Sequence, residues 1–251
     1  MQRLTLTEDS YPEHPAMDVA VSHAMLSGVA RGDIGGVFRL HVPGPVVAFG
    51  RSDRVQPGYP QAVSAARAHG FAAVERLAGG RAAVFHGSTL SFSMAVPDQD
   101  PRVGIRRRFE SIAGVMAKAF QTLGIDARIG EVPGEYCPGS WSVNVGGRVK
   151  VMGVGQRLVR GAAHVGGVVV VDDGESIRDV LIPVYRALRL DWDPRTSGAL
   201  ADRSPGLDTS KVVKAIVETL AGVYDLEPGR LPVTLVDEAR SLIPEHLPLV
   251  T

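Results

Sequence analysis

The chain has 251 residues, 45% of them hydrophobic, so it can bury a substantial core and is expected to fold as one large domain rather than two. Lysine plus arginine and aspartate plus glutamate number 27 each, which excludes an overall positive field for binding nucleic acid or an anionic membrane. The single cysteine, Cys137, excludes an internal disulfide and a multi-cysteine metal site, and it fits a reducing compartment.

The N-terminal stretch MQRLTLTEDSYPEHP lacks the basic start and apolar core of a secretion signal. The sequence also contains no run of about 18 apolar residues, the length that a membrane-spanning helix needs. We therefore expect a cytoplasmic protein without a membrane span.

In chain order, the first half of the sequence predicts helices and short strands in alternation. The ranges are a helix over 17–29 that ends near Gly32, strands over 37–42 and 46–49, a helix over 59–69 stopped by Gly70, and strands over 72–77 and 89–97.

The second half begins with a helix over 106–123, whose apolar residues share one face and which Gly124 stops. A hairpin over 140–159, with Gly146-Gly147 at its tip, and a buried strand over 162–173 follow. Further helices are expected over 176–188, 209–224 and 235–243. This order indicates an α+β fold with a mixed, largely antiparallel β-sheet flanked by helices.

The stretch ERLAGGRAAVFHG places Gly79-Gly80 between Arg76 and Arg81. Adjacent glycines can adopt positive φ and let backbone N–H groups approach an anion closely. The same pair is typical of a tight hairpin turn flanked by solvated arginines. From these residues alone, both interpretations stay open.

Lys150 lies on a predicted strand, on the face opposite Val149 and Val151. A lysine there is usually solvated, but Gly153 and Gly155 follow, and glycines within a strand mark the close approach of a ligand or of another backbone. The pattern therefore favours a site around Lys150.

Cys137, in the loop GEYCPGSW, is either an inert filler or a nucleophile whose pKa a nearby ammonium lowers. His86 and His164 lack the spacing of metal ligands, so no metal site is expected. The run 106–108 of three arginines either begins an exposed helix or contacts an acidic carrier protein.

Several motifs, taken in order over about 16–173, resemble the biotin/lipoate A/B protein ligase family. RLAGGRAAVFHG followed by LSFSMAVP resembles its arginine-rich Gly-Gly and Val-x-His segment, and VKVMGVGQR resembles the strand with its characteristic lysine. MDVAVSHAML, VVAFGRSD and AAHVGGVVVVDD resemble three further segments of that family. Glu75 departs from the pattern, because the first of two arginines usually stands there.

The resemblance implies a class II aminoacyl-tRNA synthetase/biotin ligase-like fold. It also implies one catalytic domain over 1–251, with a core over about 16–190 and a helical C-terminal extension over about 191–251.

The resemblance further implies a lipoate–protein ligase-like enzyme that uses ATP and Mg²⁺ to convert lipoic or octanoic acid into an acyl-adenylate. The acyl group then passes to a lysine of a lipoyl carrier domain, in a 2-oxoacid dehydrogenase or the glycine cleavage H protein. Lys150 is expected to bind the activated acyl group. The other substrate-binding residues implied are Arg76, Gly79, Gly80, Arg81, His86, Gly153, Gly155 and His164.

Two alternatives remain open. An octanoyltransferase of the same family would use Cys137 as a thioester nucleophile, with an octanoylated acyl carrier protein as donor and no cofactor. The other alternative is a non-catalytic protein that binds lipoyl domains or acyl groups. The presence of Glu75, where the family usually has an arginine, supports it. Biotin ligation is disfavoured because the loop Gly-Arg-x-Gly-Arg does not occur.

Overall fold

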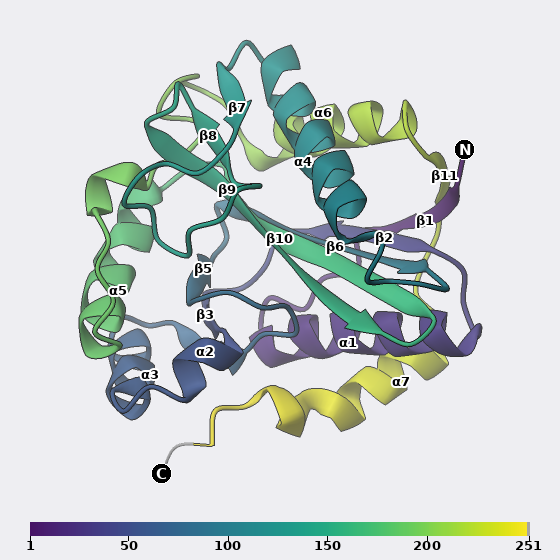
Figure 1. The fold of residues 1–251 in the computed structure, drawn as a ribbon, viewed down its shortest axis with the longest axis horizontal. Coiled ribbons are helices and arrows are strands. Elements are labelled where there is room, and N and C mark those ends of the chain that lie inside the picture. Colours follow the sequence, from purple (N-terminus) through teal and green to yellow (C-terminus); the bar gives the residue numbers. More distant parts are fainter. Residues whose placement is uncertain (250–251) are drawn as a thin grey trace.

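Two β-sheets form the frame of the computed structural model, which describes residues 1–249 (Figure 1). The larger sheet has eight strands, in the order β11 (Asp225–Pro228), β1 (Arg3–Thr7), β2 (Val37–His41), β6 (Thr89–Pro97), β10 (Ala162–Val170), β9 (Val149–Val159), β8 (Val143–Val145) and β7 (Ala127–Ile129). Strand β1 runs parallel to β2 and to β11, and the other neighbours are antiparallel. The predicted mixed, largely antiparallel sheet is confirmed.

The smaller sheet has three strands, in the order β4 (Ala72–Glu75), β3 (Val46–Phe49) and β5 (Ala83–Phe85). Strand β3 pairs with β4 in parallel and with β5 antiparallel, so β4 and β5 are separated by β3. Gly79-Gly80 therefore joins two strands that do not pair with each other. The hairpin-turn interpretation of this glycine pair is wrong, because the segment 76–82 has to cross the end of β3.

Helices cover both faces of the larger sheet (Figure 1). Helices α4 (Ile105–Thr122) and α6 (Thr209–Ala221) pack together over one face, and α1 (Pro15–Arg31) and α7 (Val233–Leu242) pack together over the other. Helices α3 (Tyr59–Ala68) and α5 (Gly174–Ala187) lie beside the smaller sheet, and the short α2 (Arg51–Arg54) follows β3. None of the helices within residues 1–249 combines the length and apolar character needed to cross a membrane.

Glycine ends the helices where the sequence predicts. Gly32, Gly70 and Gly124 have φ angles of 81°, 79° and 79°, in the left-handed region that favours glycine. The tip of the β8–β9 hairpin has Gly146 and Gly147 at φ of 61° and 72°, which a two-residue turn between twisted strands requires.

The C-terminal region adds helices and also one edge strand. The sequence predicts a helix over 209–224, but α6 ends at Ala221 and residues 225–228 form β11 against β1. The sequence DLEP has no β-branched or aromatic residue, so pairing with β1 rather than local propensity accounts for its strand conformation. Two short 3₁₀ turns, Pro194–Thr196 and Ile243–His246, complete the region.

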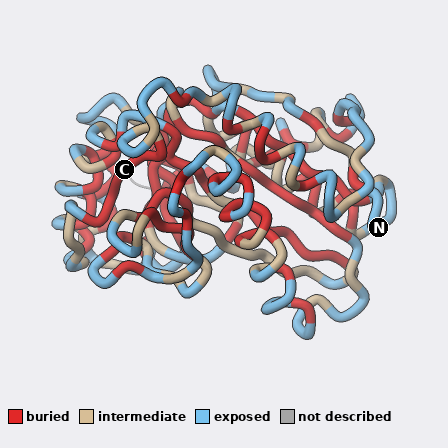
Figure 2. Tube along the Cα trace, turned by 90° about the horizontal axis from the view of Figure 1, so that it is seen from above, coloured by how far each residue is buried: buried red, intermediate tan, exposed pale blue. Residues whose placement is uncertain are grey.

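The buried residues run along the central strands, with exposed loops around them (Figure 2). Residues of α6, including Leu220, belong to the same hydrophobic cluster as Leu4 of β1 and Phe38 of β2. We therefore propose that the C-terminal extension folds in one cooperative unit with the rest of the chain.

Leu220→Ala tests this proposal. Leu220 is 0% exposed, so the truncation should lower the free energy of unfolding of the whole chain by about 2–5 kcal/mol in a single transition. Urea unfolding, followed both by circular dichroism and by tryptophan fluorescence, measures it. The control Val223→Ala, at a side chain 44% exposed, should change stability by less than about 0.5 kcal/mol. Two separate transitions, with only one shifted, would contradict one unit.

Candidate functional site

A β-bulge directs Lys150 into the interior. Asn144 of β8 pairs with Lys150, whereas its neighbour Val143 pairs with Met152, so Val151 is an extra residue in β9. The extra residue changes which side chains share a face. Lys150 now lies on the side of Gly153, where a Cβ atom would stand 3.3 Å from Lys150 Cε. Lys150 is 1% exposed, so it is not a solvated strand residue.

The Lys150 ammonium is fully hydrogen-bonded in this position. It donates to Glu135 Oε1 at 2.9 Å, to the Tyr136 carbonyl at 3.0 Å and to the Cys137 carbonyl at 2.7 Å. An ammonium has three N–H donors, so all are engaged. Lys150 thus holds the carbonyl groups of two consecutive residues, Tyr136 and Cys137.

Glu135 organises the loop around this ion pair. Besides Lys150, its Oε1 accepts from the Ser142 hydroxyl at 2.6 Å and from the Gly139 N–H at 3.2 Å, and its Oε2 accepts from the Val132 N–H at 3.0 Å. A buried charge pair offsets its desolvation only when such additional hydrogen bonds satisfy the remaining atoms. The loop over 132–142 is therefore built around one carboxylate.

Cys137 is held at both its backbone and its thiol. Its φ is 43°, unusual for a residue with a side chain, and its N–H donates to the Tyr185 hydroxyl at 2.9 Å. Tyr185 in turn donates to the Ala82 carbonyl at 3.0 Å. The thiol accepts from Arg76 Nη2 at 3.3 Å and from the Arg81 N–H at 3.2 Å. The cysteine loop and the glycine-pair loop are thereby fixed to each other.

These donors make the thiol acidic. Burial raises the pKa of Cys137, but the charges of Arg76 and Lys150 and the hydrogen bonds from Arg81 and Arg76 outweigh it and leave the pKa below its usual value. A thiolate, not a thiol, is the nucleophile. The surroundings of Cys137 thus favour a thiolate, as the nucleophile interpretation requires.

The glycine-pair loop must have glycine where it approaches the thiol. Gly80 has φ of 105°, and a Cβ atom there would lie 2.9 Å from Cys137 Sγ and would also overlap Arg76. Opposite the loop, a Cβ at Gly155 would lie 3.0 Å from Ala78 Cβ. The backbone-cradle interpretation of Gly79-Gly80 is thus consistent with the geometry, with the thiol as the group that the loop surrounds.

Glu75 does not enter the site. Its carboxylate accepts from Arg54 at 3.0 Å and from the Tyr59 hydroxyl at 3.2 Å, on the outer side of β4. The next residue, Arg76, points inward to the thiol, and its Nε has no hydrogen-bond partner within residues 1–249. The departure at Glu75 therefore leaves the inner arginine in place.

A cleft of about 460 Å³ opens at Cys137. Strand β9 extends past its partner β8, and the cleft follows its edge from Lys150 and Gly153 to Leu158, with Trp141 and Phe109 on the other wall. Its volume is within the range of small-molecule sites, about 300–1,000 Å³. Gly79, Gly80 and Gly155 also line it.

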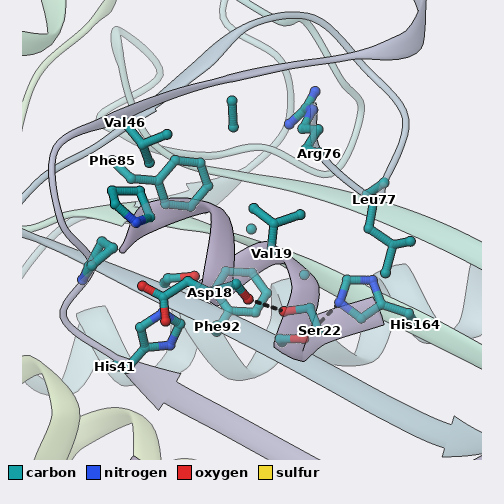
Figure 3. Close-up of a pocket in the computed structure, with 18 residues that line it drawn as sticks. Asp18, Val19, Ser22, His41, Val46, Arg76, Leu77, Phe85, Phe92 and His164 are labelled. Atoms are coloured by element: carbon teal, nitrogen blue, oxygen red, sulfur yellow. Dashed lines mark hydrogen bonds and ion pairs between the residues drawn. The ribbon is translucent and has the colours of Figure 1, made fainter. Parts of the chain in front are cut away.

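Figure 3 shows an inner pocket that adjoins the cleft. Arg76, Phe85 and Gly167 line both. The floor of the inner pocket is the face of the larger sheet toward α1. Facing residues across strands form two rows, His41–Ser91–Val168–Gly153 and Arg39–Ser93–Gly166–Gly155. Glycine and serine in the middle of these rows leave room over this face of the sheet, and Ser91, Ser93 and Gly166 line the inner pocket.

The two predicted histidines lie in different places. His164 lines the inner pocket, its Nε2 lies 2.7 Å from the Ser93 hydroxyl, and burial lowers its pKa to about 4. His86 lies at the turn between β5 and β6, where its Nδ1 accepts from the Ser88 N–H at 3.2 Å. His86 lines neither the cleft nor the inner pocket. Within residues 1–249, no three His, Cys, Asp or Glu side chains come together to hold a metal ion.

Three residues of the site are not predicted from the sequence. Glu135 and Tyr185 fix the cysteine loop, and the buried Asp53 pairs with Arg81 at 3.4 Å. Glu135 stands two residues before Cys137, but no motif marks it. Tyr185 looks like any apolar-face residue of a helix, so only the fold reveals it.

Comparison with known proteins gives a family. A model described as the lipoyl protein ligase A/B catalytic domain matches residues 14–189. The chain is 32% identical over 146 residues to an octanoyl-GcvH:protein N-octanoyltransferase of Geobacillus kaustophilus, covering 58% of this chain and 51% of that one. A Bacillus velezensis protein of the same name is 26% identical over 208 residues, 82% of this chain and 71% of that one. The chain thus spans about half the length of the first relative.

Two solved structures show the fold. A lipoate-protein ligase A bound with ATP superposes with a TM-score of 0.79 at 17% identity, covering 98% of this chain and 95% of that one. A putative lipoate protein ligase from T. acidophilum with bound lipoic acid gives 0.78 at 18% identity, covering 98% and 96%. The predicted class II synthetase-like fold is confirmed.

The acidity of the thiol can be tested with Arg76→Gln. Because the pKa of Cys137 is depressed, thiolate persists as pH falls, and alkylation by iodoacetamide should reach half its maximal rate below the pH typical of free cysteine. Arg76→Gln removes a cation and should move that midpoint upward. Mass spectrometry of the alkylated protein measures the rate. Arg54→Gln, which removes only the outer pair with Glu75, should leave the midpoint unchanged, and an equal shift in both variants would contradict the assignment.

The ion pair can be tested by a double-mutant cycle. Glu135→Leu leaves the Lys150 charge buried and unpaired, so it should lower the free energy of unfolding by about 3–5 kcal/mol. The double variant Lys150→Met/Glu135→Leu should regain part of that loss, because no charge stays buried, while the donors of Ser142, Gly139 and Val132 still lose their acceptor. Urea unfolding of the single and double variants measures both. A double variant that loses the sum of the two single losses would show that the residues are not coupled.

Proposed function

This chain belongs to the lipoyl protein ligase A/B catalytic-domain family, and we propose that it transfers an octanoyl or lipoyl group between carrier proteins through a thioester on Cys137. The acidic thiol carries this proposal. It lies between Arg76 and the Arg81 N–H, on the wall of the cleft, in the arrangement expected of a nucleophile and its charge partners.

The first half-reaction forms the thioester. The Cys137 thiolate attacks the acyl carbonyl of an octanoyl-lysine amide on the donor, an S–C bond forms and the C–N bond breaks. The donor amine leaves with a proton from solvent. Arg76 Nε is buried and has no hydrogen-bond partner within residues 1–249. In this proposal it donates to the negative oxygen that develops on the acyl carbonyl.

The second half-reaction repeats these steps in reverse. The acceptor lysine gives up a proton, its amine attacks the thioester carbonyl, and the thiolate of Cys137 leaves. One amide is lost and one is gained, so the overall exchange is close to balanced in free energy. The exchange as proposed therefore consumes no ATP.

Lys150 is a positioning residue in this proposal. Its three donors hold Glu135 and the carbonyls of Tyr136 and Cys137, so it fixes the nucleophile and contributes positive charge to the thiolate. Binding an adenylate phosphate would require these contacts to break. We therefore favour the positioning role of Lys150 over binding of an adenylate.

The relatives' names support carrier proteins on both sides of the exchange. The proteins of G. kaustophilus and B. velezensis are named octanoyl-GcvH transferases, and a Listeria monocytogenes relative, 25% identical over 166 residues, is named lipoyl-GcvH:protein N-lipoyltransferase. We propose the glycine cleavage H protein as donor and lipoyl domains of 2-oxoacid dehydrogenases as acceptors. The acyl carrier protein expected as a donor has no counterpart in these names.

Mixing the protein with octanoylated H protein and an apo lipoyl domain, without ATP, tests the exchange. Mass spectrometry should find the octanoyl group first on Cys137 and then on the lipoyl domain. Cys137→Ser should lower the rate more than about a thousandfold. The double variant Lys150→Met/Glu135→Leu should also be inactive, whereas Arg54→Gln should transfer normally.

Other outcomes separate the alternatives. Modification of the lipoyl domain only with free lipoate or octanoate and Mg·ATP would identify a ligase. Binding of the lipoyl domain without modification under either condition would identify a non-catalytic binder.

A further inference from the structure

The inner pocket ends at two buried polar side chains. His41, on β2, is 4% exposed, and Asp18, on α1, is 8% exposed. Figure 3 shows them at the end of the pocket away from Arg76. The walls between are mainly apolar, with Val19, Val46 and Phe85 around the middle. A polar group at the end of an apolar pocket needs an explanation.

The polar atoms at this end are not satisfied by the protein. Asp18 Oδ1 pairs with the Arg39 guanidinium, but Asp18 Oδ2 has no hydrogen-bond partner within residues 1–249. The same holds for both ring nitrogens of His41, although Nε2 lies 3.4 Å from Asp18 Oδ1 in a contact without hydrogen-bond geometry. Burial, and then the charge of Arg39, holds the pKa of His41 well below its usual range. The ring is therefore neutral and offers one donor and one acceptor.

A saturated acyl chain would leave these atoms without a partner. An alkyl terminus neither donates nor accepts, and a buried polar group left unpaired keeps its full desolvation penalty. A hydroxyl or thiol, by contrast, can donate to Asp18 Oδ2 and accept from the His41 N–H. The chemistry of the pocket end therefore matches a small group that both donates and accepts.

The position of the thiol selects which end of a chain meets this group. Arg76, which donates to the Cys137 thiol, lines the inner pocket at the end away from Asp18 and His41. If the carbonyl carbon lies at Cys137, beside β9, the far end of a medium-length chain approaches His41. The carboxyl end does not.

We propose that Asp18 and His41 form a subsite for a hydroxyl or thiol at the distal end of a medium-chain acyl group. The protein then prefers such an acyl group over the saturated chain of the same length. The orientation of the chain rests on the proposed function, because that function places the carbonyl at Cys137.

Isothermal titration of the protein with three free acids tests the subsite. 8-Hydroxyoctanoate should bind about tenfold or more tightly than octanoate, because a site built to bond a hydroxyl discriminates against the ligand that lacks it. 3-Hydroxyoctanoate is the matched control, since its hydroxyl lies near the carboxyl end, and it should gain no such advantage. Equal affinity for octanoate and 8-hydroxyoctanoate overturns the proposal.

Two variants assign the preference to its residue. His41→Phe removes both ring nitrogens at similar volume and should abolish the preference for 8-hydroxyoctanoate. Ser22→Ala should retain it, because Ser22 lines the same pocket but already donates to the Asp18 carbonyl at 3.2 Å. A preference that persists in His41→Phe overturns the assignment. If that variant does not fold, the comparison of the three acids on the unaltered protein decides.

This test separates the subsite from the proposed function. Titration of free acids involves no chemistry at Cys137. A protein that shows the preference but transfers no acyl group contradicts the proposed function alone. A protein that transfers octanoyl groups but shows no preference contradicts the subsite alone.

Discussion

The buried ion pair between Lys150 and Glu135 is the contact on which the rest of the site depends. One carboxylate gathers the loop over 132–142, and one ammonium joins that loop to β9. Neither charge is stable in the interior without the other. Because the ammonium also holds the Cys137 carbonyl, the left-handed backbone that aims the thiol at the cleft is a consequence of this pair.

The balance of charge explains why the thiol is the acidic group. The charges of Arg76 and Lys150 act on it, and Lys150 is paired with Glu135. Arg81 reaches the thiol through its backbone N–H, while its guanidinium pairs with Asp53. Arg76 forms no ion pair with a carboxylate in the part of the chain described, and its guanidinium contacts the thiol, although its charge also acts on Asp53. Arg76 is thus the cation most directly matched to a negative sulfur at Cys137.

The sequence predicts the longer helices and strands because their signals are local, but it gives no range for β1, β7 or β11. Glycines at helix ends and at the β8–β9 tip, and the apolar face of α4, act through neighbouring residues. The site depends on contacts between distant segments, and these carry weak signals. The bulge at Val151 puts Lys150 on the same side of the strand as Gly153, and no glycine or proline at Val151 indicates it in the sequence. Tyr185 reaches Cys137 only because α5 packs beside the smaller sheet. The resemblance to a family brought Arg76, Lys150 and the glycines together, and it also included His86, which the fold places elsewhere.

The pairing of Lys150 also bears on where the energy for acyl transfer comes from. A ligase must create an activated acyl group from a free acid, and an unpaired cation at the reacting phosphate suits that task. Here the ammonium is neutralised by Glu135, while the free positive charge belongs to Arg76 beside a thiol. In the proposed exchange, Arg76 and Cys137 instead receive an acyl group that is already bonded to a carrier and hold it as a thioester. An exchange of one amide for another needs no more than this, since the donor supplies the bond that the acceptor receives.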